Sequence, residues 1–331
     1  FKKKTLIITT INKPNKNIKL FSNNCKKNKW EFIVIGDKKT PSYFDLKYGN
    51  FLNIKKQKKL EFKFSSICPK NNYARKNIGY LLAIKNNADI IIETDDDNCP
   101  KRNFFQKIKL FHKVKQINGY GWTNIYLPFL KNKDQIWPRG LSLDNIFSKP
   151  NISAKKILAK FYLQQGICEG NPDVDAIYRL MNSKINVKFK NNLKYSLGKC
   201  VSPLNSQNTI WFKKVFPLLY LPVTCTMRST DIWRGLIARH ILSINRFKIL
   251  YFGTTMFQKR NLHNLKKDFM EEIPVYLNSS KIVKILNKVK MKKGEKYFCD
   301  NLIKSYSALI KNKIIFKEEM LYLKSWIKDL K

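Results

Sequence analysis

Short apolar runs that stop at polar residues recur through the first hundred residues of the chain. The segments 5–11, 30–35 and 88–93 are rich in β-branched and other apolar side chains, which is typical of buried parallel strands. Apolar positions three or four residues apart mark a helix over 72–86, and 16–29 shows a weaker helical period. The alternation of strand and helix predicts a parallel α/β sheet with right-handed crossovers.

The pattern changes after residue 104. We expect a helix to about residue 117, then aromatic-rich loops, and a less regular region to about residue 277. After residue 279 the segments are amphipathic and rich in lysine, which predicts C-terminal helices.

The net charge of +42 comes from 65 Lys and Arg against 23 Asp and Glu. Alone, it would suggest a polyanionic partner such as nucleic acid or an anionic membrane. However, only nine basic residues are Arg, and the lysines are spread along nearly every segment, as an AT-rich coding sequence would give without selection for binding. We therefore expect no specific nucleic-acid partner, and at most a peripheral contact between the C-terminal helices and anionic lipid. Acidic clusters and single arginines become more informative against this background.

The seven cysteines are widely spaced and include no CxxC pair. This favours free, mostly buried thiols in a reducing compartment over disulfides or a zinc site. No run approaches the roughly 18 to 20 apolar residues that a membrane span needs. We expect a cytoplasmic protein, with contact at the inner face of the membrane as the peripheral alternative.

The strongest chemical signal is the run Asp95, Asp96, Asp97 and Asn98, directly after the third predicted strand. Adjacent carboxylates repel one another unless a cation neutralises them, and hard oxygen ligands suit Mg²⁺ or Mn²⁺ that bridges nucleotide phosphates. Because alternate residues of an extended chain point the same way, Asp95 and Asp97 are the expected ligands and Asp96 is expected to face away. A solvated acidic turn or a helix cap is the alternative.

Other candidate residues lie further along. Asp173 and Asp175 either hold an acceptor or a loop, or begin a helix with favourable acids. His112, expected on a helix, and His240 are predicted to be structural.

The 26 residues YARKNIGYLLAIKNNADIIIETDDDN resemble the part of GT-A glycosyltransferases in which an ARNxGxxxA-type helix leads into a strand ending in the acidic DxD motif. Further segments are similar to the STELLO family of glycosyltransferase-like proteins, and more faintly to the reversibly glycosylated polypeptides. These segments are TTINKP, VIGDKKTP, DVDAIYRL, STDIWRG and QKRNLHNLKKDF. The similarity covers most of residues 5–275 and leaves about the last 55 uncovered.

The resemblance implies a GT-A-type α/β fold, with a mixed, mostly parallel sheet flanked by helices and with C-terminal helices. It implies a nucleotide-sugar-binding half at 1–150 and an acceptor and catalytic half of the same domain at 151–277. A C-terminal helical extension is expected at 278–331.

The resemblance also assigns site residues. Those expected to contact the donor are Asn12, Asp37, Arg75, Asn77, Asp95, Asp96 and Arg260, and those expected to hold Mn²⁺ or Mg²⁺ are Asp95, Asp97 and His263. Asp231 is expected to be the catalytic base if the reaction inverts, with Trp233 stacking on a sugar and Arg234 neutralising the surroundings. The plainer alternatives are a helix cap at Asp231, a core Trp233, a surface Arg75 and a simple turn at Asp37.

These features predict a metal-dependent glycosyltransferase that moves a sugar from a nucleoside diphosphate donor, expected to be a UDP-sugar, to a hydroxyl of a glycan or lipid-linked acceptor. Surface glycan or polysaccharide synthesis is the expected setting. One alternative is a nucleotide-sugar mutase or self-glycosylating protein. The other is a non-catalytic GT-A-like scaffold at a membrane.

Overall fold

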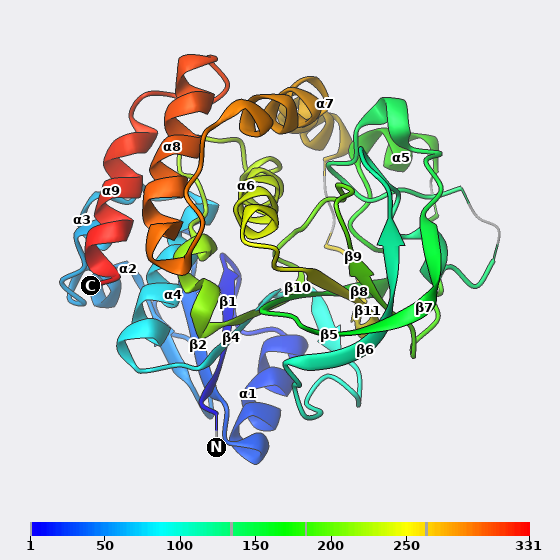
Figure 1. The fold of residues 1–331 in the computed structure, drawn as a ribbon. Helices are drawn as coiled ribbons and strands as arrows, with labels where there is room; N and C mark the ends of the chain where they lie inside the picture. The colour runs from blue at the N-terminus through cyan, green and yellow to red at the C-terminus, as the bar shows by residue number, and fades with distance from the viewer. Residues whose placement is uncertain (1, 133–134, 183, 262–263) are drawn as a thin grey trace.

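The computed structural model describes residues 2–132, 135–182, 184–261 and 264–331. Within them, one sheet of eleven strands forms the centre of the molecule (Figure 1). Its first section is parallel, in the order β3 (Asn50–Leu52), β2 (Glu31–Gly36), β1 (Lys4–Thr10) and β4 (Ile90–Asp95). The three apolar runs predicted as parallel strands are therefore confirmed as β1, β2 and β4.

The sheet continues from β4 through β10, β8, β11, β9, β6 and β7, and β5 pairs with β11. β10 is antiparallel to both of its neighbours, whereas β8 and β11 are parallel to each other. The expected mixed sheet flanked by helices is confirmed. The bounds of these strands are β5 (Asn98–Pro100), β6 (Phe111–Asn118), β7 (Asn151–Lys160), β8 (Leu163–Gly170), β9 (Lys194–Leu197), β10 (Asn208–Phe212) and β11 (Ile249–Gln258).

Helices cover both faces of this sheet (Figure 1). The α-helices of the described chain are α1 (Lys16–Asn28), α2 (Ile54–Lys58), α3 (Lys63–Ile67), α4 (Lys76–Lys85), α5 (Ala176–Met181), α6 (Thr230–Ile244), α7 (Leu265–Lys288), α8 (Phe298–Lys311) and α9 (Glu319–Asp329). The short 3₁₀ helices are η1 (Tyr73–Arg75), η2 (Leu127–Phe129), η3 (Leu143–Asn145), η4 (Lys213–Leu219) and η5 (Glu295–Tyr297). The helix predicted over 72–86 is confirmed as η1 followed by α4.

The helix predicted over 104–117 is wrong, because residues 111–118 form the strand β6 between β7 and β9. Val114 and Ile117 are three residues apart, which mimics a helical stripe. In the strand they point to opposite faces and belong to separate apolar clusters.

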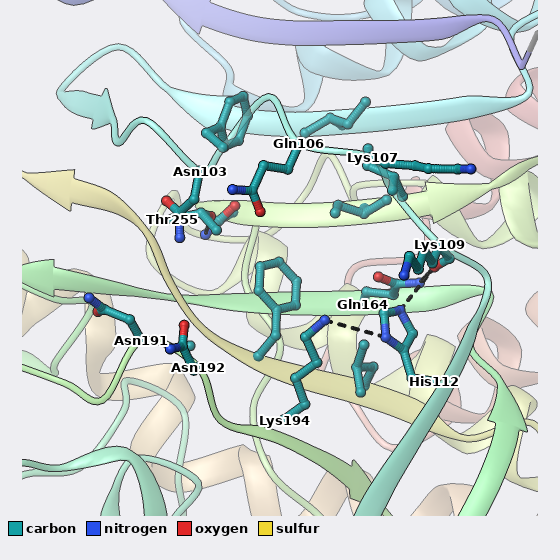
Figure 2. A pocket seen from close by; sticks show the side chains of 18 of the residues that line it. Asn103, Gln106, Lys107, Lys109, His112, Gln164, Asn191, Asn192, Lys194 and Thr255 are labelled. Atoms are coloured by element: carbon teal, nitrogen blue, oxygen red, sulfur yellow. Dashed lines mark hydrogen bonds between the residues drawn. The ribbon is translucent and has the colours of Figure 1, made fainter.

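Alternate residues of the central strands build the two layers. On β4, Ile90 and Ile92 pack in the cluster that includes α1, whereas Ile91 packs in the larger cluster with α4 and α6. On the α1 face, the strands and the segment 103–109 enclose a cavity (Figure 2). On the other face, α4 approaches closely at Gly79, where an added Cβ would lie 2.9 Å from Ile7 Cγ2. This contact explains a glycine inside a helix.

A buried ion pair joins the two layers at the centre. The guanidinium of Arg234 on α6 donates to both oxygens of Glu93 on β4, at 2.8 and 3.0 Å. Tyr80 and Trp211 donate to the same carboxylate, and Arg234 stacks on the Trp211 ring. Both charged side chains are almost completely buried. The pair fixes α6 against β4.

The C-terminal helices pack on other helices beside the first section of the sheet, with α9 against α3 and α8 against α6 and η4 (Figure 1). Glu319, at the start of α9, accepts hydrogen bonds from the backbone amides of Val223 and Thr224. Asp329, at its end, accepts from the amides of Lys63 and Phe64, the first residues of α3. The expected boundary between 277 and 278 lies inside α7, and the division into two halves and an extension stays a prediction.

No helix in the described part of the chain is both long and apolar enough to span a bilayer. All seven cysteines are free thiols, as the spacing predicted, and four of them are buried.

Replacing Arg234 by Met should lower the free energy of unfolding by about 3–5 kcal/mol, because Glu93 would stay buried without a cation. The double variant Glu93→Gln/Arg234→Met should recover part of that loss. Urea unfolding of both variants measures the effect, and Arg102→Met, at an exposed position, is the control. Equal midpoints for Arg234→Met and Arg102→Met would contradict the importance of the pair.

Candidate functional site

The acidic run lies where β4 ends, at the carboxyl edge of the parallel section. The register places Asp95 beside Thr9 of β1. Asp95 Oδ1 accepts a hydrogen bond from the Tyr73 hydroxyl at 3.0 Å and lies 3.4 Å from Lys76 Nζ. Its side chain is 32% exposed, and Oδ2 accepts none of the hydrogen bonds made by the described residues. Asp95 thus presents one open carboxylate oxygen at the end of the sheet.

The surroundings of Asp95 favour a bound cation. Although the Asp95 side chain is 32% exposed, desolvation by the surrounding protein raises its pKa to about 6; Lys76 opposes this, and the carboxylates of Asp97 and Asp231 add to it. Asp97 is buried, and its Oδ2 accepts from Gln258 on β11. The structure therefore brings the two expected ligands and Asp231 close enough to influence one another.

Asp96 faces the other way, as the alternation predicted. Its carboxylate accepts from the Thr10 hydroxyl at 2.6 Å and from the Asn12 side chain at 3.1 Å. Its carbonyl accepts from Asn15, which also caps α1. Asn12 and Asp96, both expected at the donor site, are thus in contact, and they tie the end of β4 to the loop after β1.

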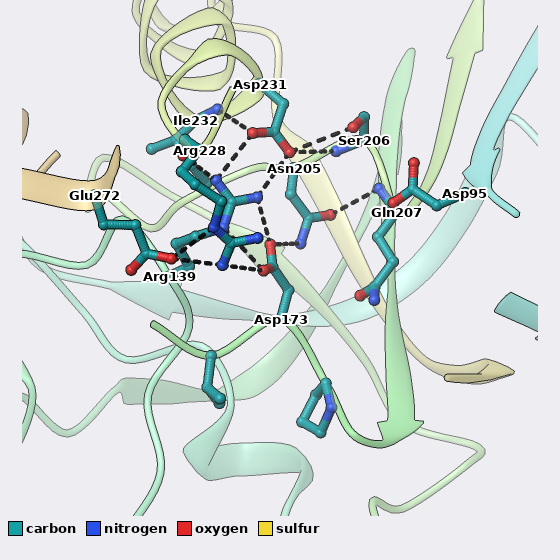
Figure 3. Close-up of polar contacts among 12 residues, drawn as sticks. Asp95, Arg139, Asp173, Asn205, Ser206, Gln207, Arg228, Asp231, Ile232 and Glu272 are labelled. Atoms are coloured by element: carbon teal, nitrogen blue, oxygen red, sulfur yellow. Dashed lines mark hydrogen bonds and ion pairs between the residues drawn. The ribbon is translucent and has the colours of Figure 1, made fainter. Parts of the chain in front are cut away.

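Asp231 lies in the first turn of α6 and is held by Arg139. Two guanidinium nitrogens of Arg139 donate to the two oxygens of Asp231, each at 3.0 Å (Figure 3). The other side of the same guanidinium donates to Asp173, at 2.8 and 2.9 Å. Burial alone would raise the pKa of Asp173, but Arg139 holds it below its ordinary value. One buried arginine is therefore shared by two buried carboxylates.

A chain of hydroxyls connects Asp231 to Asp95. The backbone amide of Ser206 donates to Asp231 Oδ2 at 3.2 Å, and Ser206 Oγ lies 3.3 Å from the same oxygen. Ser206 Oγ is also 2.5 Å from the Tyr73 hydroxyl, which donates to Asp95. Burial and Asp95 raise the pKa of Tyr73, so this hydroxyl keeps its proton.

The Asp231 carboxylate has little capacity left for an acceptor proton. Oδ1 accepts from Arg139 and from the amide of Ile232, and Oδ2 accepts from Arg139 and Ser206. A carboxylate has about four acceptor sites. The alternative of a helix cap is wrong, because Ser229 occupies the cap position of α6, and the role of catalytic base stays a prediction. The geometry assigns Asp231 the role of orienting Arg139 and Ser206.

Arg139 depends on a close approach of its loop to α6. The next residue, Gly140, has φ +89°, and an added Cβ would lie 2.4 Å from Ile232 Cγ2. Only glycine accommodates both conditions. The loop therefore reaches α6 directly beside Asp231.

A second layer of charge surrounds Asp173. Arg228 pairs with Glu272 of α7 at 2.5 Å and lies 4.0 Å from Asp173. Arg260 pairs with Asp268 of α7 at 2.8 Å. Burial, followed by Arg228, lowers the pKa of Arg260. Arg260 is thus held close to this cluster, and its predicted contact with the donor stays a prediction.

Asp175 has the plainer of its two expected roles. It caps α5 by accepting from the Tyr178 amide, and it also accepts from the Trp137 indole. Burial raises its pKa to about 6 despite these hydrogen bonds.

Arg75 and Asn77, expected to contact the donor, are turned into the protein. Arg75 donates to the Gln57 side chain at 2.9 Å and to the Cys68 carbonyl at 3.0 Å. Asn77 is fully buried and forms two hydrogen bonds with the backbone of Leu221. Both side chains thus hold neighbouring segments against η1 and α4, and their predicted contact with the donor stays a prediction.

Asp37 also has a structural role here. Its carboxylate accepts from the backbone amides of Lys38, Asn71 and Asn72. It therefore orders the loop before η1, and the turn alternative describes it better than a contact with the nucleotide.

Trp233 and Arg234 are core residues. Trp233 is 3% exposed, so it offers no surface to a sugar. Arg234 neutralises Glu93, and Asp231 is neutralised by Arg139 instead. His240 is a buried residue of α6, as expected, and burial lowers its pKa to about 4. His112 lies on the strand β6, contrary to prediction.

The predicted metal site is only partly described. His263 lies outside the described residues, and among the described residues no group of three or more His, Cys, Asp or Glu could hold a metal ion. However, Mg²⁺ commonly uses one or two carboxylates, with substrate phosphates and water completing its shell. The open oxygen of Asp95 next to Asp97 fits an ion that binds together with a diphosphate.

The residues that sequence reasoning missed are Tyr73, Lys76, Arg139, Asn205 and Ser206. Tyr73 and Lys76 lie on either side of Arg75 in the sequence and about one helical turn apart. Both contact Asp95, whereas Arg75 points away from it. The scarcity of arginine was a usable signal for Arg139. Nothing local marks Ser206 or Asn205, which donates to Asp173, because tertiary contacts alone bring them here.

Comparisons with known proteins confirm the family resemblance. The family model described as STELLO glycosyltransferases matches residues 228–331. The chain is 25% identical over 322 residues to the Arabidopsis thaliana protein named "Probable glycosyltransferase STELLO1" and 23% identical over 320 residues to the one named "Probable glycosyltransferase STELLO2". Each alignment covers 91% of this chain and 41% of the relative, so the chain spans about two fifths of their length. The match to residues 278–331 corrects the expectation that the resemblance leaves them uncovered.

Solved structures are more distant. A mycobacterial protein has a TM-score of 0.43 at 7% identity, over 84% of this chain and 74% of its own. The glucosyl-3-phosphoglycerate synthase of M. tuberculosis has a TM-score of 0.41 at 10% identity, over 84% of this chain and 80% of its own.

Replacing Arg139 by Met should cost about 3–5 kcal/mol of unfolding free energy at pH 7, because Asp173 and Asp231 would stay buried without their cation. In the native protein the pKa of Asp173 is lower than in the unfolded chain. This difference stabilises the fold at pH values above the unfolded pKa, and the stabilisation is lost as the pH falls below the native pKa. Without Arg139 the buried carboxylates should instead take up protons more readily in the folded state. The loss of unfolding free energy caused by Arg139→Met should therefore become smaller as the pH falls from 7 to 5.

Chemical unfolding at several pH values measures this difference. Arg239→Met is the matched control, because Arg239 is also buried but donates to the backbone carbonyls of Lys199 and Cys200. If the loss of unfolding free energy in Arg139→Met does not change with pH, as expected for Arg239→Met, then Arg139 does not compensate the charge of the two carboxylates.

Proposed function

Because the chain resembles the STELLO glycosyltransferases over nine tenths of its length, we propose that it transfers a sugar from a nucleoside diphosphate donor to a hydroxyl group. One observation carries the proposal. An open carboxylate oxygen of Asp95 stands at the carboxyl edge of the parallel strands, which is where α/β sheets bind nucleotides. The relatives' names support the proposed reaction class, and the position of Asp95 supports the proposed site.

For the donor side, we propose a UDP-sugar with Mn²⁺ or Mg²⁺. Asp95 and Asp97 would hold the ion, with His263 as the third predicted ligand. Such an ion neutralises the charge that develops on the departing diphosphate. Lys76, buried and 3.4 Å from Asp95, supplies one further positive charge at the same place. It balances part of the acidic run, which leaves the remaining charge for the ion.

For the acceptor side, the hydroxyl chain from Asp95 through Tyr73 and Ser206 to Asp231 sets the geometry. Arg139 fixes Asp231, and Asp231 fixes Ser206, so these groups form a rigid wall beside the proposed donor site. A preorganised polar wall lowers the cost of reorganisation in the transition state. The acceptor that we propose, from the resemblance alone, is a glycan or lipid-linked hydroxyl compound.

The first test measures release of nucleoside diphosphate from a panel of nucleotide-sugars, with Mn²⁺ and with a chelator. Asp95→Asn should lower the rate by about 100-fold or more, because one charged oxygen ligand is lost. Asp45→Asn is the matched control, since that carboxylate is 52% exposed and outside the site. Full activity of Asp95→Asn, or rates unaffected by the chelator, would contradict the metal-dependent assignment.

A second test separates orientation from base catalysis at Asp231. As an orienting residue, Asp231→Asn should lower the rate by about tenfold and leave the shape of the pH–rate profile unchanged. A catalytic base would instead cost about 10²- to 10⁴-fold and remove the acidic limb of the profile. Circular dichroism and the unfolding midpoint of Asp231→Asn show whether the fold is retained.

A further inference from the structure

The cavity on the α1 face of the sheet (Figure 2) has a volume of about 320 Å³ and lies on the face opposite to Arg139 and Asp231. Gln164 of β8 and Leu250 of β11 line it, whereas the next residues, Gln165 and Tyr251, line the small polar space beside Arg139. Because successive residues of a strand point to opposite faces, the sheet separates the two sites. The volume is at the lower end of the range for small-molecule sites.

The cavity combines an apolar floor with amide walls. Ile210, Leu250 and Phe252 rise from β10 and β11, and Trp30 and Phe104 close one side. Asn103, Gln106, Gln164, Asn191, Asn192 and Asn208 supply side-chain amides around the floor. An apolar floor beneath a rim of amides suits a ligand with a C–H face and several hydroxyl groups.

Two residues that line this cavity carry a buried side-chain amide oxygen with no partner among the described residues. Asn208 is completely buried, its amide nitrogen donates to Thr255 Oγ1 at 2.9 Å, and no described donor reaches its Oδ1. Asn103 donates to the Thr254 carbonyl, and its Oδ1 is likewise buried without a described donor. A buried acceptor left unpaired is costly, so each such atom calls for a donor. Ligand hydroxyl groups would supply these donors.

Positive charge gathers at one end of the cavity, around Lys109, His112 and Lys194 (Figure 2). Lys194 Nζ lies 3.4 Å from His112 Nδ1, and His112 Nε2 bonds to the Lys109 carbonyl at 3.0 Å. Burial, followed by Lys194, lowers the pKa of His112, so the imidazole accepts from Lys194 in its neutral form. No acidic residue lines the cavity, and in the described chain neither Lys109 nor Lys194 forms an ion pair. The two lysines thus provide uncompensated charge for an anion.

We propose that this cavity binds a sugar phosphate, with the phosphate at Lys109 and Lys194, hydroxyl groups donating to Asn103 and Asn208, and the ring against Phe252. The site is separate from the proposed donor site and goes beyond the proposed transfer reaction. Since the two sites lie on opposite faces of one sheet, both can be filled at once. The ligand is recognised by two features together, an anionic group and hydroxyl donors.

Calorimetric titration of the intact protein with glucose 6-phosphate tests this site, with glucose and inorganic phosphate as separate probes. Glucose 6-phosphate should bind at least about tenfold more tightly than either probe, because it alone satisfies both ends of the cavity. Lys194→Gln should weaken its binding by about tenfold through the lost charge. Lys113→Gln should have no effect, since Lys113 is exposed on the same strand as His112 but does not line the cavity.

Asn103→Asp is a second variant, at a partly exposed position, that keeps an acceptor oxygen and adds negative charge. Asn103→Asp should weaken the binding of glucose 6-phosphate more than the binding of glucose. All titrations are repeated with saturating UDP and Mn²⁺, which should leave the affinity unchanged. Absence of binding, displacement by UDP, equal affinity for phosphate alone, or equal effects of Lys194→Gln and Lys113→Gln would each overturn the proposal. Failure of the donor assay, by contrast, would leave these titrations unaffected.

Discussion

The buried pair of Glu93 and Arg234 is the constraint on which the site depends. It joins β4 to α6 with two hydrogen bonds of 2.8 and 3.0 Å inside an apolar core. Asp95 follows Glu93 by two residues, and Asp231 precedes Arg234 by three, or about one helical turn. A buried pair adds little net stability compared with apolar residues, but it accepts few alternative arrangements. The sheet and the helix are thereby locked in one register, with the carboxylates of both turned to the same edge.

Arginine is used in this chain for structure rather than for contact with solvent. Six of the nine arginines are buried, whereas lysine covers the surface. A planar guanidinium with five donors can serve two partners at once, as Arg139 does for Asp173 and Asp231. The ammonium of lysine would not offer this geometry. The scarcity of arginine therefore marks places where the fold is held together. Among the described arginines, Arg139 pairs with Asp231, and Arg228 lies 4.0 Å from Asp173.

Local pattern was sufficient for the parallel strands and for the acidic run, because the information for both lies within a few neighbouring residues. It failed where a side chain's direction depends on distant contacts. Arg75 and Lys76 are adjacent and differ by about 100° around the helix axis, so only packing decides which one faces Asp95. Val114 and Ile117 have helical spacing, yet pairing with β7 and β9 makes their segment a strand. Arg139 bonds to Asp173 and Asp231, which lie 34 and 92 positions away from it in the sequence, so no local pattern could predict these contacts.

The C-terminal helices complete the support of the site. Glu319 is fully buried and binds the amides of Val223 and Thr224, in the segment that leads from η4 to α6. Asn77 of α4 holds Leu221 in the same segment. The segment that precedes α6 is therefore held by α4 through Asn77 and by α9 through Glu319. The position of Asp231 thus depends on α9 as well as on the sheet. The family model begins at residue 228 and extends to 331, so it joins α6 and these helices in one unit. This agrees with a site whose geometry is set by helices remote from it in sequence.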